Sequence, residues 1–443
     1  MNKKEILKSL VMLSIPTMIE QILSTLLQYV DTAMVGHLGQ QATASVSTTT
    51  TITWLVNSIP HALGIAFLAM ISKECGAGHK DRTRRLAGQA MTISLVVGSV
   101  LTVVCVLLSS QIPQWMHAEE AIWETAGTYF AIISLAMVFR SMNTIFAAAL
   151  RAVKNTKTPM FINLGANGLN ILLNYLFIYR MNFGVIGAAI GSAISYSIFG
   201  GWMVLAARKH EFLTFGREDL RLEKRSMEKV LHIGIPALST STASCLGYVF
   251  FASMVSGMGT TIFAAHSIAV TAEQLFYVPG HGLRQATSSL VGNSIGEKNP
   301  KKQHLVEHLS ILITIGIMFL TGLCLFLVAL PLMKVFTNQE DVAVIGAAML
   351  RLVAFTEPFF GLMIVMEGIA YGTGRTMEVF LIETCSMWGI RIVFTYLVTN
   401  VWMLGLTQVW YCMIADNIVK ALGLSFCYLY HYRKEKKGEV FGV

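Results

Sequence analysis

Twelve apolar stretches, each long enough to cross a bilayer as a helix, follow one another along this chain. The chain is 54% hydrophobic and only 13% charged, whereas a soluble domain carries about 25% charged residues. Because hydrocarbon offers the backbone no hydrogen-bond partners, such stretches must be helical. We therefore expect an all-α polytopic membrane protein with twelve transmembrane helices. They cover residues 9–35, 45–72, 86–110, 121–150, 159–179, 184–207, 230–255, 263–290, 303–333, 343–370, 377–398 and 407–431.

The second half of the chain repeats the first at a distance of 220 residues. A duplicated half is typical of membrane transporters, in which the path lies between the two halves. The repeat therefore predicts two pseudo-symmetric six-helix bundles. The matching residues include Ile15-Pro16 with Ile235-Pro236, Gly39 with Gly259, Ala44 with Ala264, Ser47 with Ser267, His61 with His281, and Gly76 with Gly296.

Basic residues gather in alternate loops. Of the 33 Lys and Arg, 26 fall in these loops and in the termini, whereas the opposite loops hold only Arg180 and Lys334. Basic loops remain in the cytoplasm, so we expect a multi-pass protein of the cell inner (cytoplasmic) membrane with both termini cytoplasmic. The charge-rich segment 208–229 is interpreted as a cytoplasmic linker between an N-terminal six-helix lobe, residues 1–207, and a C-terminal lobe, residues 230–443.

Signs of enzyme chemistry are absent from the sequence. It has no phosphate-binding glycine loop, and its seven cysteines show no CxxC spacing. His304 and His308 lie four residues apart, but no third metal ligand is evident. We expect no enzyme activity, no metal site, no cofactor and no nucleic-acid partner. Any transport would then draw on a proton or sodium gradient, or on the gradient of the substrate itself.

The first apolar stretch carries a polar stripe. Glu20, Ser24, Gln28 and Asp31 are spaced by four, four and three residues, so they lie on one face of a helix. Polar faces in lipid must meet each other or water. We therefore expect a wet substrate cavity in the first bundle, lined by this stripe and by a matching stripe on the second helix. That second stripe comprises Thr50, Trp54, Asn57 and His61.

Asp31 is the favoured coupling residue. Counting from the helix ends at 1.5 Å per residue places Asp31, Asn170, Asn174 and Ser192 at similar depths in the outer half of the bilayer. A carboxylate with two amides and a hydroxyl could coordinate sodium or exchange a proton. Alternatively, Asp31 is satisfied by neighbouring hydrogen bonds and only holds helices together.

The second half carries a larger set of charges within its helices. Acids and bases occur there at matched depths, which favours ion pairs that hold helices together. A role in titration or in cation binding is the alternative. This C-lobe charge network comprises Glu273, Arg284, Glu357, Glu367, Glu383, Arg391 and Asp416.

Together these residues resemble the multidrug and toxic compound extrusion (MATE) family over nearly the full length. The resemblance implies two six-helix lobes, alternating access, and drug export coupled to inward proton or sodium flow. It matches Asp31 to the family's proton-sensing aspartate, and Asn170 and Ser192 to its polar partners. The motifs are Pro16, Val30-Asp31-Thr32, Val35-Gly36-His37-Leu38-Gly39, Asn170 with Asn174, Gly184, Gly187-Ala188-Ala189, Pro236, Val291-Gly292 and Gly296.

Three positions depart from the family pattern. Asn174 stands where one branch has a second aspartate on helix five. Ser244 and Phe360 stand at the positions that match the acidic residues of the sodium-coupled branch on helices seven and ten. These departures favour the branch that couples at the helix-one aspartate, and they leave sodium at the N-terminal lobe open.

The sequence therefore predicts a secondary active antiporter that exports amphipathic, cationic drugs and toxic compounds in exchange for protons, with sodium as the other candidate ion. Beyond these substrates we expect only the lipid bilayer as a partner, and a monomer. A lipid-linked precursor flippase of similar architecture is one alternative, although it would want a cationic cavity. An intramembrane enzyme of the polyprenyl-transferase type is another, but no clustered acidic metal-binding motif is present.

Overall fold

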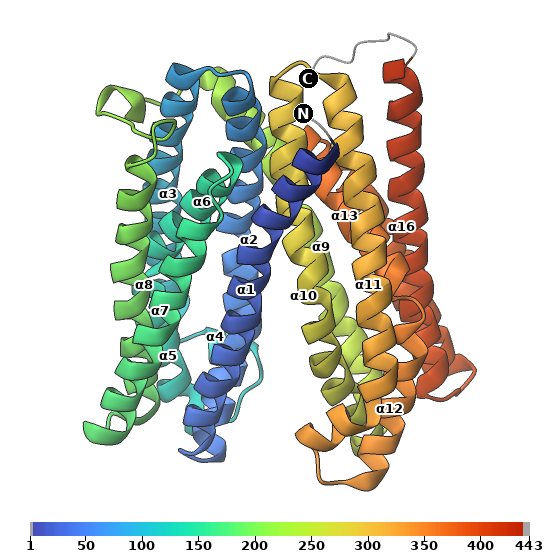
Figure 1. Ribbon diagram of the computed structural model, residues 1–443. Helices are drawn as coiled ribbons and strands as arrows, with labels where there is room; N and C mark the ends of the chain where they lie inside the picture. The colour runs from blue at the N-terminus through green and yellow to red at the C-terminus, as the bar shows by residue number, and fades with distance from the viewer. Residues whose placement is uncertain (1–2, 437–443) are drawn as a thin grey trace. The chain divides into compact units, whose positions relative to one another are not determined.

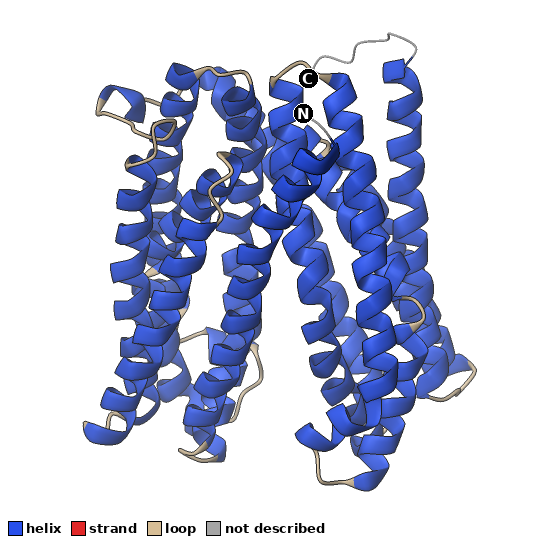
Figure 2. Cartoon of the chain, viewed as in Figure 1, coloured by secondary structure: helices blue, strands red, loops and turns tan. Residues whose placement is uncertain are grey.

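The computed structural model describes residues 3–436, and every regular element in that part is helical (Figures 1 and 2). Long helices run through the molecule and are joined by short loops. They are α1 (Lys3–Gly36), α2 (Gln40–Gly76), α3 (Lys80–Leu108), α4 (Ile112–Trp115), η1 (Glu120–Ile122), α5 (Trp123–Leu135), α6 (Met137–Ala152), α7 (Lys157–Tyr175), η2 (Leu176–Arg180), α8 (Gly184–Arg208), η3 (Glu218–Leu220), α9 (Lys224–Ser256), α10 (Thr260–Gly296), α11 (Pro300–Phe336), α12 (Glu340–Ala354), α13 (Glu357–Thr373), α14 (Thr376–Ser386), η4 (Met387–Ile392), α15 (Val393–Tyr396), η5 (Leu397–Val401) and α16 (Leu406–Lys436).

These helices account for all twelve predicted stretches. Within residues 3–436, nine helical segments are long and apolar enough to cross a membrane, and two bent pairs bring the number to eleven. The twelfth stretch is α10, a helix of 37 residues that is made more polar by residues such as Glu273 and Arg284. The predicted all-α, twelve-helix membrane fold is confirmed.

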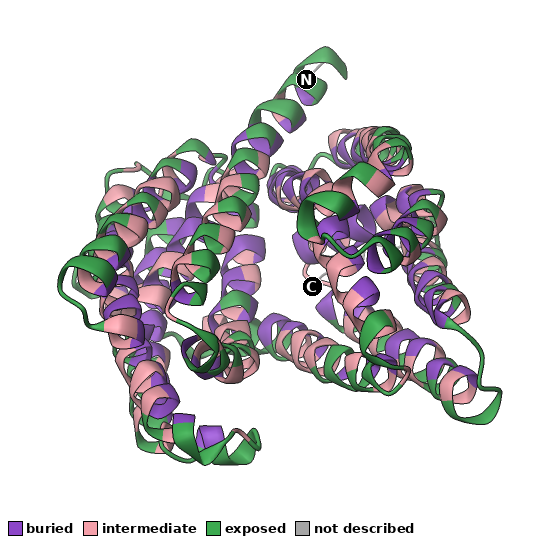
Figure 3. Cartoon of the chain, turned by 90° about the horizontal axis from the view of Figure 1, so that it is seen from below, coloured by how far each residue is buried: buried purple, intermediate pink, exposed green. Residues whose placement is uncertain are grey.

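The outer faces of the helices are apolar. Large hydrophobic side chains such as Leu107, Leu312 and Leu327 are about 70% exposed (70%, 70% and 68%), and exposed side chains cover the outward faces of the bundles in Figure 3. Water would make so large an apolar surface costly, whereas lipid does not. The exposed face is therefore the one that contacts the bilayer.

The repeat extends to the loops. Gly39 and Gly259 both adopt positive φ, at 107° and 114°, and both directly precede a helix of 37 residues. Positive φ recurs at the same 220-residue spacing at Lys154 and Gly374. Glycine tolerates this backbone region because it lacks a Cβ atom. The chain therefore turns at equivalent places in its two halves.

Two predicted helices, 121–150 and 343–370, are each broken. The α5–α6 pair bends by 50° and the α12–α13 pair by 59°, at positions 220 residues apart. In the second break Pro358 begins α13 and cannot continue a preceding helix. In the first, Thr102 of α3 donates its hydroxyl to the carbonyl of Ser134, which leaves the helical ladder there.

The described chain forms two compact units. The N-terminal unit comprises Ile15–Leu238 with Gly292–Asn299, and the C-terminal unit comprises the remaining described residues. Phe67, Ile71 and Phe146 are completely buried in the core of the N-terminal unit. In the C-terminal unit Val409 and Trp410 are completely buried. Each unit thus has its own apolar core.

The predicted linker, 208–229, is well packed. Asp219 is buried, forms an ion pair of 3.1 Å with Arg84 of α3, and accepts a hydrogen bond from the Gly216 amide at 2.8 Å. The backbone of Asp219 lies against Gly88 of α3, where a Cβ atom would collide. The segment therefore follows α3 in the N-terminal unit. The assignment of lobes 1–207 and 230–443 around it stays a prediction.

Adjacent glycines on α8 provide a test of this packing. A Cβ atom at Gly200 would collide with the backbone oxygen of Phe139 on α6, whereas one at Gly201 would meet nothing within 4 Å. We expect Gly200→Ala to lower the stability of the protein by about 1–3 kcal/mol, the usual cost of overpacking. Gly201→Ala should leave it unchanged or slightly higher. Thermal unfolding in detergent measures both, and equal behaviour of the two variants would contradict this packing.

Candidate functional site: a polar cavity in the N-terminal unit

The polar stripe of α1 meets a stripe of asparagines on α7. Asn163 donates to Glu20 at 2.6 Å, Asn167 donates to Ser24 at 3.1 Å, and Asn174 donates to Asp31. Each pair is separated by 143 residues in the sequence. A constant separation means that the two helices run parallel and in register, so polar groups on one find partners along the length of the other.

The partner of the α1 stripe is therefore α7, and the expectation that the α2 stripe would share the cavity needs correction. Thr50, Trp54 and His61 are exposed, Asn57 is half-buried, and none of the four lines the cavity described below. Thr50 donates its hydroxyl to the Val46 carbonyl of its own helix, so it needs no partner on α1. A part for these four residues in substrate binding stays a prediction.

Glu20 forms an ion pair. One guanidinium nitrogen of Arg151, at the end of α6, lies 2.8 and 2.9 Å from the two carboxylate oxygens of Glu20. Both side chains are largely buried. Sequence reasoning missed this pair because Arg151 was assigned to a cytoplasmic loop. Its depth, close to that of Glu20 when counted from the cytoplasmic helix ends, is the signal that could have found it.

Asp31, Asn174, Asn170 and Ser192 form one hydrogen-bonded chain across three helices. The Asn174 amide nitrogen donates to Asp31 and also, at 3.3 Å, to the side-chain oxygen of Asn170. Asn170 in turn donates to the Ser192 hydroxyl at 3.0 Å. Gly191 leaves room for the buried Asn174, because a Cβ atom there would collide with the Asn174 side-chain oxygen. The four residues of the predicted coupling site thus lie together.

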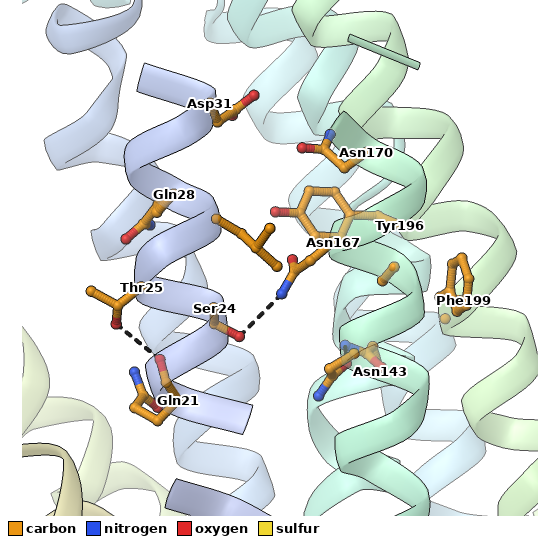
Figure 4. Close-up of a pocket in the computed structure, with 14 residues that line it drawn as sticks. Gln21, Ser24, Thr25, Gln28, Asp31, Asn143, Asn167, Asn170, Tyr196 and Phe199 are labelled. Carbon is orange, nitrogen blue, oxygen red and sulfur yellow. Dashed lines mark hydrogen bonds between the residues drawn. The ribbon is translucent and has the colours of Figure 1, made fainter. Parts of the chain in front are cut away.

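A cavity of about 290 Å³ opens between α1, α6, α7 and α8. Ser24, Gln28, Asp31 and Asn170 line it, whereas Glu20, Asn174 and Ser192 lie behind its wall. Figure 4 shows the amide side chains projecting toward the space between α1 and α7. The full lining is Gln21, Ser24, Thr25, Leu27, Gln28, Asp31, Asn143, Asn163, Ala166, Asn167, Asn170, Tyr196, Phe199 and Gly200.

Sequence reasoning missed most of the amides in this lining. Asn163, Asn167, Asn170 and Asn174 are spaced by four, three and four residues, which places all of them on one helix face. That spacing was the available signal. Among the lining residues Asp31 alone is an acid and none is a base. The charge of this cavity therefore depends on whether Asp31 is ionised.

In the C-terminal unit, Asp416 is the centre of a buried charge cluster. Its carboxylate lies 2.8 Å from Arg391 and 3.0 Å from Lys420, and it accepts a hydrogen bond of 2.6 Å from the Ser386 hydroxyl. Arg391 also donates to Asn417 at 3.0 Å. Of the acids considered for Arg391, the structure therefore pairs it with Asp416.

The other acids of the C-terminal unit are only partly paired. Arg284 contacts Glu367 at 2.6 Å, and Glu383 lies against the same carboxylate. Glu273 accepts a hydrogen bond from Tyr277. Glu357 is buried, and neither of its oxygens has a hydrogen-bond partner. Ion pairing thus explains Arg284, Glu367, Arg391 and Asp416, but it does not explain Glu273 or Glu357.

The histidines considered as metal ligands have other contacts. His304 lies 3.1 Å from Glu307, and a ring nitrogen of His308 lies 2.7 Å from the backbone oxygen of His304. Within residues 3–436, no group of three or more His, Cys, Asp or Glu side chains is arranged to hold a metal ion.

Comparison with known proteins places this geometry in a family. The MatE family model matches residues 16–176 and, a second time, residues 236–397. The chain belongs to the MatE family. Both matches begin and end at equivalent positions of the 220-residue repeat, so each half is one copy of the family unit. Members of this family are membrane transporters, so the protein is a transporter and not an enzyme, and the polyprenyl-transferase alternative is excluded.

Relatives match along almost the whole chain. A protein of Thermotoga maritima named "Probable multidrug resistance protein NorM" is 27% identical over 430 residues, which are 94% of this chain and 91% of that protein. "Probable multidrug resistance protein YpnP" of Bacillus subtilis is 25% identical and is covered to 88%, as is this chain. An outward-facing structure of a multidrug resistance MATE family transporter has the same fold, with a TM-score of 0.90 at 23% identity over 97% of this chain and 96% of that one.

The Asp416 cluster yields a stability prediction. Asp416→Asn would leave Arg391 and Lys420 buried without a carboxylate, which costs about 3–5 kcal/mol for a broken buried pair. We expect a large loss of thermal stability in detergent. The control is Glu357→Gln, which removes a buried acid that makes no hydrogen bond, so it should be neutral or stabilising. Equal losses in the two variants would argue against the pairing described here.

Proposed function

We propose that this protein is a secondary active antiporter of the inner membrane that exports amphipathic organic cations from the cytoplasm in exchange for protons. The names of its relatives, which are multidrug resistance proteins, support export of drugs and toxic compounds. The positive-inside pattern supports cytoplasmic termini. We propose that the monomer is sufficient, because each chain carries both family units.

One observation carries the choice of coupling site. Asp31 is the single acid in the lining of the cavity, and it is held by an amide rather than by a base. An intramembrane carboxylate that has no basic partner must be neutralised by a proton, a metal cation or a cationic substrate. Competition among these ligands for one carboxylate is sufficient to couple an ion to a drug.

The proposed cycle follows from that competition. With Asp31 ionised, the cavity attracts an organic cation, whose polar groups can be satisfied by the lining amides. Protonation of Asp31 from the outside removes the attracting charge and alters its bond with Asn174, so the hydrogen-bonded chain through Asn170 and Ser192 rearranges. The substrate then leaves, and loss of the proton to the inside restores the cavity. Differential binding of the two states provides the coupling free energy.

Sodium is the second candidate ion, on a separate observation. The side-chain oxygen of Asn174 is buried and has no hydrogen-bond partner among the described residues. Hard cations prefer oxygen ligands such as carboxylates and amide carbonyls. Asp31 and Asn174 could therefore hold Na⁺ in place of a proton.

The flippase alternative is less favoured. A carrier of lipid-linked precursors must bind anionic phosphates, which requires cationic side chains. The lining of the cavity in the N-terminal unit contains neither Lys nor Arg. Its one charged group, Asp31, would repel a phosphate.

Replacement of Asp31 tests the proposed coupling. In proteoliposomes with proton and sodium gradients varied separately, we expect Asp31→Asn to reduce gradient-driven export by about 5- to 150-fold, the range of ordinary coupling free energies. Asp341→Asn is the control, because Asp341 is an exposed acid at the start of α12. Unimpaired export by Asp31→Asn would sink the proposal. Loss of sodium-driven export alone would replace the proton by sodium.

A further inference from the structure

Arg140 is an intramembrane cation without an acidic partner. It lies on α6, just after the break between α5 and α6, and among the described residues no carboxylate forms an ion pair with it. Its guanidinium carbon instead lies over the ring of Tyr196 on α8, 4.5 Å from the ring centre. Arg151 on the same helix is bonded to Glu20. A charged group that is placed in lipid without a counter-charge requires a function.

Tyr196 connects Arg140 to the candidate coupling site. It follows Ser192 by four residues, so the two side chains lie on one face of α8. Ser192 is the end of the hydrogen-bonded chain that begins at Asp31. Tyr196 itself lines the cavity, and Figure 4 shows its hydroxyl pointing from α8 toward α1. One face of the Tyr196 ring is thus occupied by a cation, at the wall of the cavity that contains Asp31.

Charge accounting within the helices of the N-terminal unit gives the same link. Glu20 and Arg151 cancel each other, which leaves Asp31 and Arg140 as the opposite charges around the cavity. Tyr129 of α5 experiences the charges of both Asp31 and Arg140, together with the neighbouring Tyr196. The two charges therefore act on the same small region of the unit, although they form no direct contact.

We propose that Arg140 is the remote counter-charge of Asp31, a positioning residue that sets the pH at which Asp31 exchanges its proton. This inference rests on the proposed function. The guanidinium remains charged at all relevant pH values, and its field favours the ionised state of Asp31. A direct ion pair such as Glu20–Arg151 would hold the carboxylate permanently ionised and block exchange. By holding Arg140 through its ring, Tyr196 keeps the cation near but lets Asp31 bind a proton or a drug.

The sign of the effect follows from this arrangement. Removing the positive charge makes ionised Asp31 less favourable, so Asp31 keeps its proton to higher pH. A unit charge about 12 Å away at an effective dielectric constant of about 20 shifts a titration by about one pH unit. We therefore expect the pH profile of substrate binding and exchange to move upward by about one unit in Arg140→Gln and in Arg140→Met. Arg140→Lys keeps the charge and should restore the profile.

The experiment is a pH series of ethidium binding and exchange by purified protein in proteoliposomes. Wild type, the three Arg140 variants and Asp31→Asn are compared. The two neutral variants replace the guanidinium by an amide or a thioether, and the one that remains monodisperse with a cooperative thermal transition is used. The other titratable groups near the cavity are Tyr129 and Tyr196, which are unchanged in every variant, as is the Glu20–Arg151 pair.

The outcomes separate this inference from the proposed function. An upward shift in the neutral Arg140 variant, restored in Arg140→Lys and accompanied by a flat profile in Asp31→Asn, supports both. An unchanged midpoint in the neutral variant, with a flat profile in Asp31→Asn, overturns only the role of Arg140. A change of KM for ethidium with no change of midpoint also overturns it, because Arg140 would then act on the substrate. A wild-type profile in Asp31→Asn overturns both proposals.

Discussion

The match of two polar stripes in lipid is the constraint on which the N-terminal unit depends. Water cannot satisfy a side-chain amide or carboxylate in hydrocarbon, so each must find a partner on another helix. The asparagines of α7 provide that partner to Glu20, Ser24 and Asp31 of α1 because the helices are parallel and in register. The same bonds fix one wall of the polar cavity and hold Asp31 in place.

Repetition built the scaffold, and its asymmetry carries the chemistry. The two halves share helix lengths, turns and the positions of the two helix breaks. They do not share charges. Asp31 corresponds to Phe251, which is buried and packs edge-on against the ring of His266. The N-terminal unit therefore offers one carboxylate to an exchangeable ligand, whereas the C-terminal unit neutralises much of its charge through Asp416 and Glu367.

Most of the fold could be predicted because lipid leaves the backbone few choices. Apolar length located all twelve stretches, and counting depth brought Asp31, Asn170, Asn174 and Ser192 to one level. The break at Ser134 could not be predicted, since it depends on a hydroxyl from α3. Nor does helical periodicity say which neighbour a polar face meets, so α2 was considered as the partner of α1 in place of α7. The pairing of Glu20 with Arg151 escaped notice because a long side chain reaches back from the helix end.

The central claim is that one carboxylate, Asp31, exchanges a proton for a cationic substrate. The direct measurement is proton release when ethidium binds to the purified protein in weakly buffered detergent solution. At a pH where Asp31 is partly protonated, the account predicts uptake of ethidium with release of up to one proton per molecule bound, and no release by Asp31→Asn. Binding of ethidium to wild type without proton release across the pH range, or release of equal size by Asp31→Asn, would contradict it.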